Sequence, residues 1–295
     1  MKKNIYNIGK KILTPFPKTK VFLKQVYRTT RTSYLKMRHP NGGFMRCNGA
    51  EVFCDFSSEN YAWYDGDSDF LNYELDVFTS LFREKTPDIV LDVGAHWGFY
   101  PAFLSNSIYA KIISKLILIE ADPSNNDILS KTLAKINQFP VVQVNAAISD
   151  KDGYINLYSG HDACTQTYYS PNTFPCGQVQ AISLDSMVER FLKNEGVITH
   201  VKLDIDGYEP AFFAGGTQIL KRFKPIIMME FWAKGLKVSG FNLEEYWNML
   251  QENYYVREAC FPNSCLIPLN HEDLTYLVNK TIDGITNLVL VPKVV

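Results

Sequence analysis

Charged and apolar residues alternate along residues 201–206, and this stretch carries the strongest signs of chemistry. In an extended strand, the side chains of Lys202, Asp204 and Asp206 point to one face. Charges on a strand between other strands are costly unless they pair or serve a ligand. With Glu209 just downstream, these residues are candidates for taking a proton from a bound hydroxyl or for orienting it. The alternative is an internal Lys202–Asp204 ion pair that only holds the strand end.

Other residues could share this chemistry. His161 is a rival base, because an unperturbed imidazole titrates near neutrality, although a lone loop histidine is often just a polar surface residue. A divalent cation is a further alternative, since hard cations take oxygen ligands. Its candidate ligands are Asp185, Asp204, Asp206 and Glu230. Their spacing is not diagnostic, so a metal is not the favoured interpretation.

A glycine turn follows the apolar run at residues 89–93. Residues 92–100 read Asp-Val-Gly-Ala-His-Trp-Gly-Phe-Tyr, and Gly94 and Gly98 let a ligand approach the backbone closely. The Gly-x-x-x-Gly spacing does not match the Gly-x-Gly-x-x-Gly of dinucleotide sites, which disfavours an NAD-dependent oxidoreductase. A turn with a purely structural role is the alternative.

The next apolar run ends in an acid, Glu120. An acid at the tip of the second strand is placed to accept hydrogen bonds from both hydroxyls of a ribose. The alternative is a helix cap, with Asp122 capping a helix that Pro123 begins. The two strand ends together indicate a nucleoside-bearing cofactor without a required pyrophosphate, and S-adenosylmethionine (SAM) fits that description.

These blocks resemble the FkbM family of SAM-dependent methyltransferases. The similar segments are 92–100, 120–123, 145–153, 182–185, 202–209 and Glu230. The resemblance covers roughly residues 88–260, and 202–209 is its most distinctive part. The chain departs from the family pattern at His96 (usually Asn), Ala121 (usually Pro) and Asp206 (usually Glu).

The resemblance implies O-methylation, commonly of glycans or of secondary metabolites. The cofactor contacts expected from it are Asp92, Gly94, Ala95, His96, Gly98, Tyr100, Glu120 and Ala147. We therefore expect SAM-dependent methylation of a hydroxyl on a glycan or glycolipid precursor. A small-molecule O-methyltransferase of secondary metabolism is the runner-up. Aromatic residues at 61–64 and in the loop 159–178 could stack on sugar faces or simply pack together.

From residue 88 onward, the pattern alternates between strand and helix. Short apolar or β-rich runs occupy 89–93, 116–119, 141–145, 198–203, 225–231, 254–257 and 288–291. Runs that are apolar on both faces and separated by crossovers predict a mainly parallel sheet with helices on both faces. We expect the seven-stranded, Rossmann-like α/β fold of class I methyltransferases, with the last strand antiparallel. Residues 154–158 and 179–182 predict an inserted hairpin.

The N-terminal segment is strongly basic. Residues 1–50 hold 12 of the 30 Lys and Arg residues and none of the 31 Asp and Glu residues. We expect residues 1–68 to form a basic arm and a small accessory region with a strand pair around Asn48, and residues 69–295 to form the methyltransferase domain. The arm, residues 1–38, is predicted to bind an anionic membrane surface. Docking on the acidic body and contact with RNA are alternatives, although an acidic folded domain makes a nucleic-acid partner the weaker hypothesis.

The composition is that of an ordinary soluble protein, with 46% hydrophobic and 21% charged residues among 295. This excludes a disordered chain and a coiled coil. No apolar run approaches the roughly 20 residues that a membrane-spanning helix needs, and the basic start does not read as a signal peptide. The six cysteines lack a Cys-x-x-Cys pair, which disfavours structural zinc. We expect free thiols and a cytoplasmic enzyme, with the inner membrane face as an alternative location.

Overall fold

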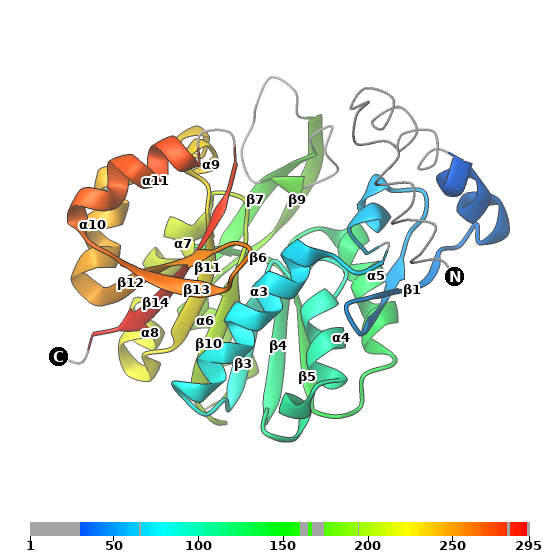
Figure 1. Ribbon diagram of the computed structural model, residues 1–295, viewed down its shortest axis with the longest axis horizontal. Helices are drawn as coiled ribbons and strands as arrows, with labels where there is room; N and C mark the ends of the chain where they lie inside the picture. The colour runs from blue at the N-terminus through cyan, green and yellow to red at the C-terminus, as the bar shows by residue number, and fades with distance from the viewer. Residues whose placement is uncertain are drawn as a thin grey trace.

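The computed structural model describes residues 30–64, 66–159, 165–166, 174–193, 195–281 and 284–293. Its centre is a mixed sheet of eight strands in the order β13-β12-β14-β11-β10-β3-β4-β5 (Figure 1). The five strands from β11 to β5 run parallel, whereas β14 is antiparallel to both β11 and β12. The strands of this sheet are β3 (Ile89–Val93), β4 (Lys115–Glu120), β5 (Val141–Asn145), β10 (Ile198–Leu203), β11 (Ile226–Phe231), β12 (Tyr254–Cys260), β13 (Cys265–Leu269) and β14 (Thr286–Pro292).

All seven apolar runs form strands of this sheet, and the antiparallel last strand is confirmed. The predicted count of seven is wrong by one, because β13 adds an eighth strand at the edge. This strand pairs only with β12, in a hairpin in which Cys260 lies opposite Cys265. Its side chains are mostly exposed or half-buried. Its sequence, Cys-Leu-Ile-Pro-Leu, is apolar, but a proline within a run argues against a central strand and fits one at the edge of a sheet.

Helices cover both faces of the sheet, as predicted. On one face, α3 (Asp69–Ser80) and α4 (Phe99–Ser105) pack against side chains such as Val90, Leu116 and Met228. On the other face, the buried residues of α6, α7, α8, α10 and α11 pack against Leu91, Ile117 and Ile227. The bounds of the remaining helices are α5 (Pro123–Leu133), α6 (Leu184–Phe191), α7 (Glu209–Ala214), α8 (Thr217–Phe223), α9 (Ala233–Val238), α10 (Leu243–Asn253) and α11 (Leu274–Lys280). Short 3-10 helices are η1 (Glu59–Tyr64), η2 (Leu81–Arg83), η3 (Ile108–Lys111) and η4 (His271–Asp273).

A second, smaller sheet contains the predicted hairpin. Its order is β6-β9-β7-β8, and β7 pairs with β9 in antiparallel fashion. The bounds are β6 (Ala147–Ser149), β7 (Gly153–Ser159), β8 (Thr165–Gln166) and β9 (Phe174–Ser183). Figure 1 shows the β7–β9 ribbon rising above one end of the large sheet.

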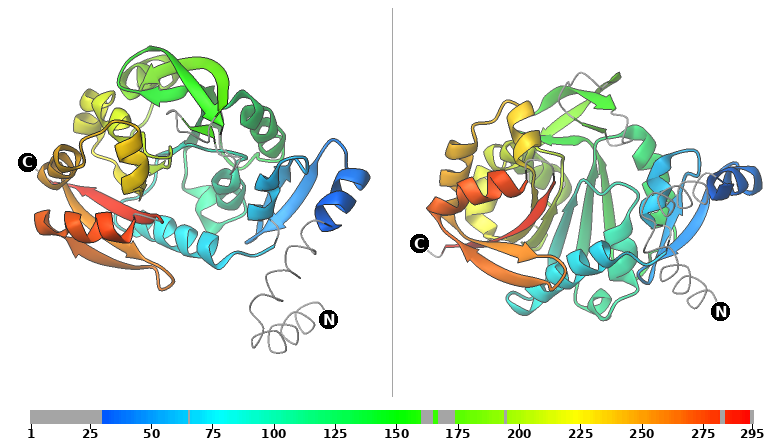
Figure 2. Two further views of the ribbon diagram at one scale, coloured as in Figure 1. Left: turned by 90° about the horizontal axis from the view of Figure 1, so that it is seen from above. Right: turned by 45° about the horizontal axis from the view of Figure 1, so that its top comes forward.

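The N-terminal region packs onto the large sheet. Its strands β1 (Gly43–Cys47) and β2 (Ala50–Cys54) form the predicted pair around Asn48. Buried side chains of β1, β2 and η1 belong to the same hydrophobic cluster as Val90 and Leu116 of the sheet. The boundary between residues 68 and 69 therefore does not separate two hydrophobic cores. Figure 2 shows this region on the opposite side of the molecule from the C-terminus. Of the basic arm, residues 1–29 lie outside the described part of the chain.

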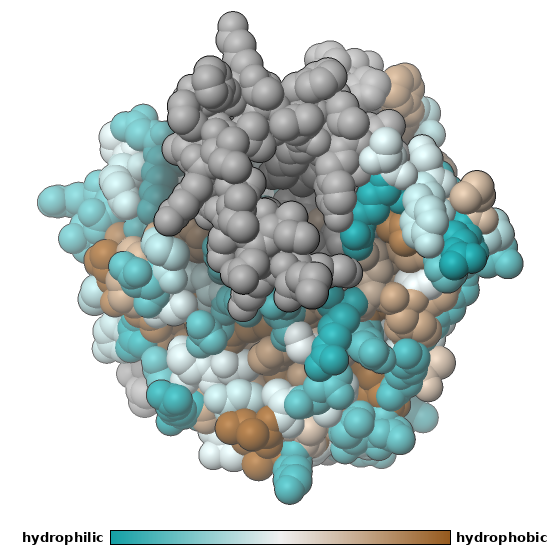
Figure 3. Space-filling view, turned by 45° about the vertical axis from the view of Figure 1, so that its right-hand side comes forward, coloured by the Kyte–Doolittle hydropathy of each residue, from teal (hydrophilic) through white to brown (hydrophobic). Residues whose placement is uncertain are grey.

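Several sequence-level expectations concern the surface and the thiols. Within the described residues, the structure has no helix that is both long and apolar enough to cross a membrane. Hydrophilic side chains prevail over the coloured surface in Figure 3.

Five of the six cysteines are free thiols, as expected: Cys47, Cys54, Cys176, Cys260 and Cys265. Cys164 lies outside the described residues.

Candidate active site

The glycine turn after β3 is held tightly against the neighbouring strands. The backbone N–H groups of Gly94 and Ala95 both donate to the carbonyl of Ile119, over 2.9 and 3.1 Å. Gly94 has a φ of +83°, and a Cβ at this position would lie 1.8 Å from the carbonyl oxygen of Asp204. Only glycine fits both the left-handed backbone and this close approach. The turn therefore brings the ends of β3, β4 and β10 together at one edge of the sheet.

The carboxylate of Glu120 organises this turn. Its Oε2 accepts from the backbone N–H of His96 over 2.8 Å, and its Oε1 accepts from that of Asp122 over 2.9 Å. The amide of Asn125 also donates to Oε1, over 3.3 Å. Burial raises the pKa of Glu120, whereas these hydrogen bonds favour the ionised form. Asp122 caps α5 by accepting from the N–H of Ser124, so the predicted cap and the strand-end acid are two different residues.

Lys202 is a buried ammonium group surrounded by carboxylates. Its Nζ lies 2.5 Å from Oδ2 of Asp204, which forms the ion pair considered from the sequence. Burial lowers the pKa of Lys202, but Asp204, Glu74 of α3 and Asp92, which pairs with Lys202 in register, together raise it above its usual value. Burial raises the pKa of Asp92 to about 7, and its Oδ2 accepts no hydrogen bond from the described residues. One cation thus faces three acids.

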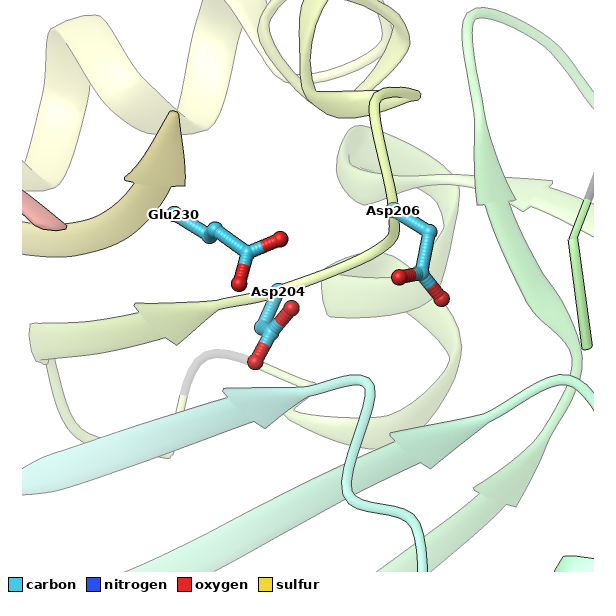
Figure 4. Close-up of side chains that lie close together, drawn as sticks. All are labelled: Asp204, Asp206 and Glu230. Carbon is cyan, nitrogen blue, oxygen red and sulfur yellow. The ribbon is translucent and has the colours of Figure 1, made fainter. Parts of the chain in front are cut away.

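Two further acids extend this negative site beyond Lys202. Figure 4 shows Asp204 and Glu230 at the ends of β10 and β11, with Asp206 on the turn that follows β10. One carboxylate oxygen from each of the three lies within 4.8 Å of the others. Burial, reinforced by Asp204 and Glu209, raises the pKa of Asp206 to about 8. Burial and repulsion from Asp204 and Asp206 also raise the pKa of Glu230. Asp206 can therefore exchange a proton with a ligand near neutral pH.

Glu209 stabilises the turn that carries Asp206. Its Oε1 accepts from the N–H groups of Ile205 and Gly207, over 3.1 and 3.3 Å. Its side chain is fully buried, and burial raises its pKa to about 7. One oxygen of Glu209 thus stabilises its own turn, while its buried Oε2 accepts no hydrogen bond from the described residues. Contact of Glu209 with a substrate hydroxyl stays a prediction.

Three other candidate residues lie outside the acidic group. The carboxylate of Asp185 accepts from the N–H groups of Gln218 and Ile219 at the start of α8, so it does not join the acidic group. Tyr100 is buried in the core, with its ring 5.3 Å from Nζ of Lys202, and forms part of the wall behind the site. Ala147 is buried in β6 opposite Ala181. His161 lies outside the described residues.

The remaining cofactor candidates follow the turn directly. Ala95 is buried, and His96 has a left-handed backbone with a φ of +48°. Gly98 caps the start of α4, also with positive φ. These residues lie together with Asp92, Gly94 and Glu120, so the loop brings six of the eight predicted cofactor residues to the same strand ends. Their contacts with SAM remain a prediction.

Sequence reasoning missed three residues of this region. Glu74 lies beside Lys202, and the side chains of Asn60 and Tyr64 reach the imidazole of His96. Tyr61 and Tyr64 are both buried, so neither is exposed for stacking on a sugar. Of these residues, only Glu74 could have been found from the sequence. It is an acid on an apolar helix face, and burying an unpaired acid costs free energy.

The fold and the site together define a class I methyltransferase: a mainly parallel sheet in this strand order, with an acid-rich group at the ends of its central strands. The model of the family described as "Methyltransferase FkbM domain" matches residues 92–256, which is more than half of the chain. The chain belongs to this family. It is a methyltransferase, and its cofactor is SAM.

Solved structures resemble the chain only distantly. The FkbM methyltransferase from Methylobacillus flagellatus KT is 14% identical with a TM-score of 0.43, and the match covers 75% of this chain and 52% of that one. The chain thus spans about half the length of that relative. SMU.1697c from Streptococcus mutans, solved in complex with SAH, is 13% identical with a TM-score of 0.41, covering 76% and 97%. An rRNA methylase from Streptococcus thermophilus is 12% identical with a TM-score of 0.39, covering 76% and 95%. No curated protein matches the sequence.

The residues at the strand ends fit the cofactor. SAM carries a positive sulfonium, and the surplus of carboxylates around Lys202 favours a cationic ligand. The buried Oδ2 of Asp92 accepts no hydrogen bond from the described residues, so it is available to a donor group of the ligand. The residues that would hold SAM are therefore Asp92, the 94–98 turn and Glu120.

Replacing Glu120 with Ala is expected to weaken SAM binding by roughly tenfold or more. Each hydrogen bond to the charged carboxylate of Glu120 contributes about 1.5–3 kcal/mol. The substitution also leaves the backbone N–H of His96 without its acceptor. Calorimetric titration with SAM measures the effect. Asp122→Ala is the control, because it should cost about 1 kcal/mol of stability through the lost helix cap without changing affinity. Equal affinities for the Glu120 variant and the wild type would remove Glu120 from the site.

Proposed function

We propose that this enzyme O-methylates a hydroxyl of a carbohydrate, either a glycan or a lipid-linked glycan precursor. The observation that carries the proposal is the group formed by Asp204, Asp206 and Glu230 at the ends of β10 and β11. A sugar hydroxyl is a weak acid, so its methylation calls for a base at the oxygen. Half-buried carboxylates supply such a base, and they also accept hydrogen bonds from neighbouring hydroxyls.

Asp206 is the proposed base. Asp206 and Glu230 accept no hydrogen bond and form no ion pair within the described residues, whereas Asp204 is engaged by Lys202. A raised pKa near neutrality makes Asp206 a stronger base than an ordinary carboxylate. Bound SAM supplies a methyl group activated by its positive sulfur. Asp206 then holds the proton that the acceptor hydroxyl loses, while the Lys202–Asp204 pair orients the hydroxyl.

The charge of the site also favours a neutral acceptor. Several carboxylates around one ammonium group repel a phosphodiester or a carboxylate more than a neutral polyol. RNA is therefore disfavoured as acceptor. A neutral phenol or another small hydroxylated metabolite remains the second candidate, because it would meet the same base.

A further proposal rests on the sequence. The basic residues 1–38 would hold the enzyme at an anionic membrane surface, which suits a lipid-linked acceptor.

A divalent cation on Asp204, Asp206 and Glu230 is the alternative use of these acids, because their oxygens lie close enough to share one ion. In that case the metal, not Asp206, would activate the hydroxyl.

An acceptor screen with methyl-labelled SAM tests the proposal. The full chain is offered neutral glycans, lipid-linked glycans in anionic vesicles, small phenols and RNA. We expect label in a glycan arm as a methyl ether, which resists alkaline hydrolysis. Label confined to phenols would favour the second candidate. Label in RNA, on nitrogen or in an alkali-labile ester would overturn the proposal.

A further inference from the structure

The 3-10 helix η1 lies outside the segment that matches the family model, yet two of its side chains form hydrogen bonds to His96 of the glycine turn. Asn60 Nδ2 lies 3.1 Å from His96 Nε2, and Tyr64 Oη lies 2.8 Å from His96 Nδ1. Both ring nitrogens of His96 are therefore bonded to a single short segment. The rings of Tyr64 and His96 also stack, with their centroids 6.1 Å apart.

These two contacts define the state of the imidazole. The Asn60 amide donates to Nε2, so the hydrogen of the neutral ring sits on Nδ1 and is donated to the Tyr64 hydroxyl. Burial lowers the pKa of His96 to about 4, although Asp204 and Asp122 act in the opposite direction. The ring is thus neutral at physiological pH, with both nitrogens satisfied.

The ring orientation is coupled to the backbone of the turn. His96 has a φ of +48°, a left-handed conformation that is uncommon for a residue with a side chain. Its backbone N–H donates to Glu120, and its ring stacks on Trp97 with the centroids 4.9 Å apart. Trp97 in turn donates to Asn125, which also bonds Glu120. Contacts that fix the ring therefore also fix the position of the Glu120 carboxylate.

We propose that Asn60 and Tyr64 are positioning residues of the methyl-donor site, which hold the His96 turn in the conformation that binds SAM. The N-terminal region is then part of the working site and not an independent appendage. This inference rests on the placement of SAM at the 94–98 turn.

A pair of tyrosine substitutions tests the proposal in the full chain. Tyr61 and Tyr64 lie on the same 3-10 helix and are both buried, but the Tyr61 hydroxyl bonds Thr32 instead of His96. We expect Tyr64→Phe to weaken SAH binding about three- to tenfold in calorimetry, which is the range for one lost neutral hydrogen bond. Tyr61→Phe should stay within about twofold of the wild type. Equal losses in both variants would indicate a merely structural role for the helix and overturn the proposal.

The substitution Asn60→Asp tests the proposal through the pKa of His96, which a purely structural role of Asn60 would leave unchanged. A carboxylate beside Nε2 favours the protonated ring, so the pKa of His96 measured by NMR in the free protein should rise from about 4 toward neutrality. The groups facing the ring are otherwise unchanged: Tyr64, Glu120 through the backbone N–H, and the more distant Asp122 and Asp204. SAM affinity should then fall more steeply from pH 8 to 6 in this variant than in the wild type, because only the variant's ring gains positive charge near a cationic ligand. Protonation of Asp92 and Asp206 over the same range lowers the affinity of both proteins alike.

The outcomes separate this inference from the placement of the site. If Asn60→Asp shows the wild-type pKa for His96 and the same change of affinity with pH as the wild type, the inference is wrong. If Glu120→Ala also binds SAM like the wild type, the placement itself fails. If only the Glu120 variant loses affinity, the site stands and Asn60 and Tyr64 have no positioning role.

Discussion

Asp206→Asn is expected to lower kcat by about 100- to 10,000-fold, the usual effect of losing a general base, while SAH binding stays close to the wild-type value. The substitution keeps the size of the side chain but removes its ability to take a proton. Because Asp206 has its pKa raised to about 8, its basic form increases as pH rises toward that value. The wild-type rate should therefore climb with pH up to about 8, and this limb should vanish in the variant. Steady-state kinetics across pH 6 to 9 measures both effects.

Two comparisons make this result specific. Asp204→Asn should also lower kcat, because it leaves Lys202 without its 2.5 Å partner. Asp185→Asn is the matched control and should keep nearly the wild-type rate, since that carboxylate bonds the start of α8. Wild-type rates for both strand-end variants would place the base elsewhere, with His161 the next candidate. Loss of wild-type activity in a chelator, restored by Mg²⁺ or Mn²⁺, would assign these acids to a metal.

Gly94→Ala is expected to abolish detectable SAH binding and to lower the free energy of unfolding by about 2–5 kcal/mol. The added Cβ would lie 1.8 Å from the carbonyl oxygen of Asp204, a distance that forces the β3 turn and the end of β10 apart. Both the methyl-donor loop and the acidic group would shift. Urea denaturation and calorimetry measure the two effects.

The control for this variant is Gly240→Ala. Gly240 has nearly the same left-handed φ, +86°, but a Cβ there would meet no atom within 4 Å. Its substitution should cost only the backbone term of about 1–2 kcal/mol and leave SAH affinity unchanged. If the two alanine variants lose equal stability and both bind SAH, the close approach of Gly94 to Asp204 is not required for the site.

The central sheet could be predicted from the sequence because its strands are buried on both faces. A run such as Ile89–Val93 is apolar except for Asp92, and this charged residue stands out for that reason. The edge strand β13 was missed because Pro268 interrupts its apolar run. The strand-end residues Asp92, Glu120 and Asp204 were found because parallel strands bring their carboxyl ends to one edge.

Contacts between distant segments could not be predicted in the same way. Asn60 and Tyr64 lie over 30 residues before His96, and neither their type nor their spacing indicates that they bond an imidazole. Asp185 looked like the other acids in the sequence, but it lies at the start of a helix instead of a strand end, where it meets the backbone of α8. Glu209 was placed in the right region, but its hydrogen bonds to the backbone of its own turn could not be foreseen, because a buried carboxylate can serve its own turn as well as a ligand.

The central claim is that the methyl donor binds where β3, β4 and β10 end, beside the acids that receive the acceptor. A crystal structure of the full chain with SAH tests it most directly. We predict density for SAH along the 94–98 turn, with the ribose at Glu120 and the homocysteine portion toward Asp92, and with Asp206 facing the space left for an acceptor. SAH bound elsewhere, for example in the groove between β5, β9 and α6 that Gln143, Gln180 and Phe191 line, would contradict the account.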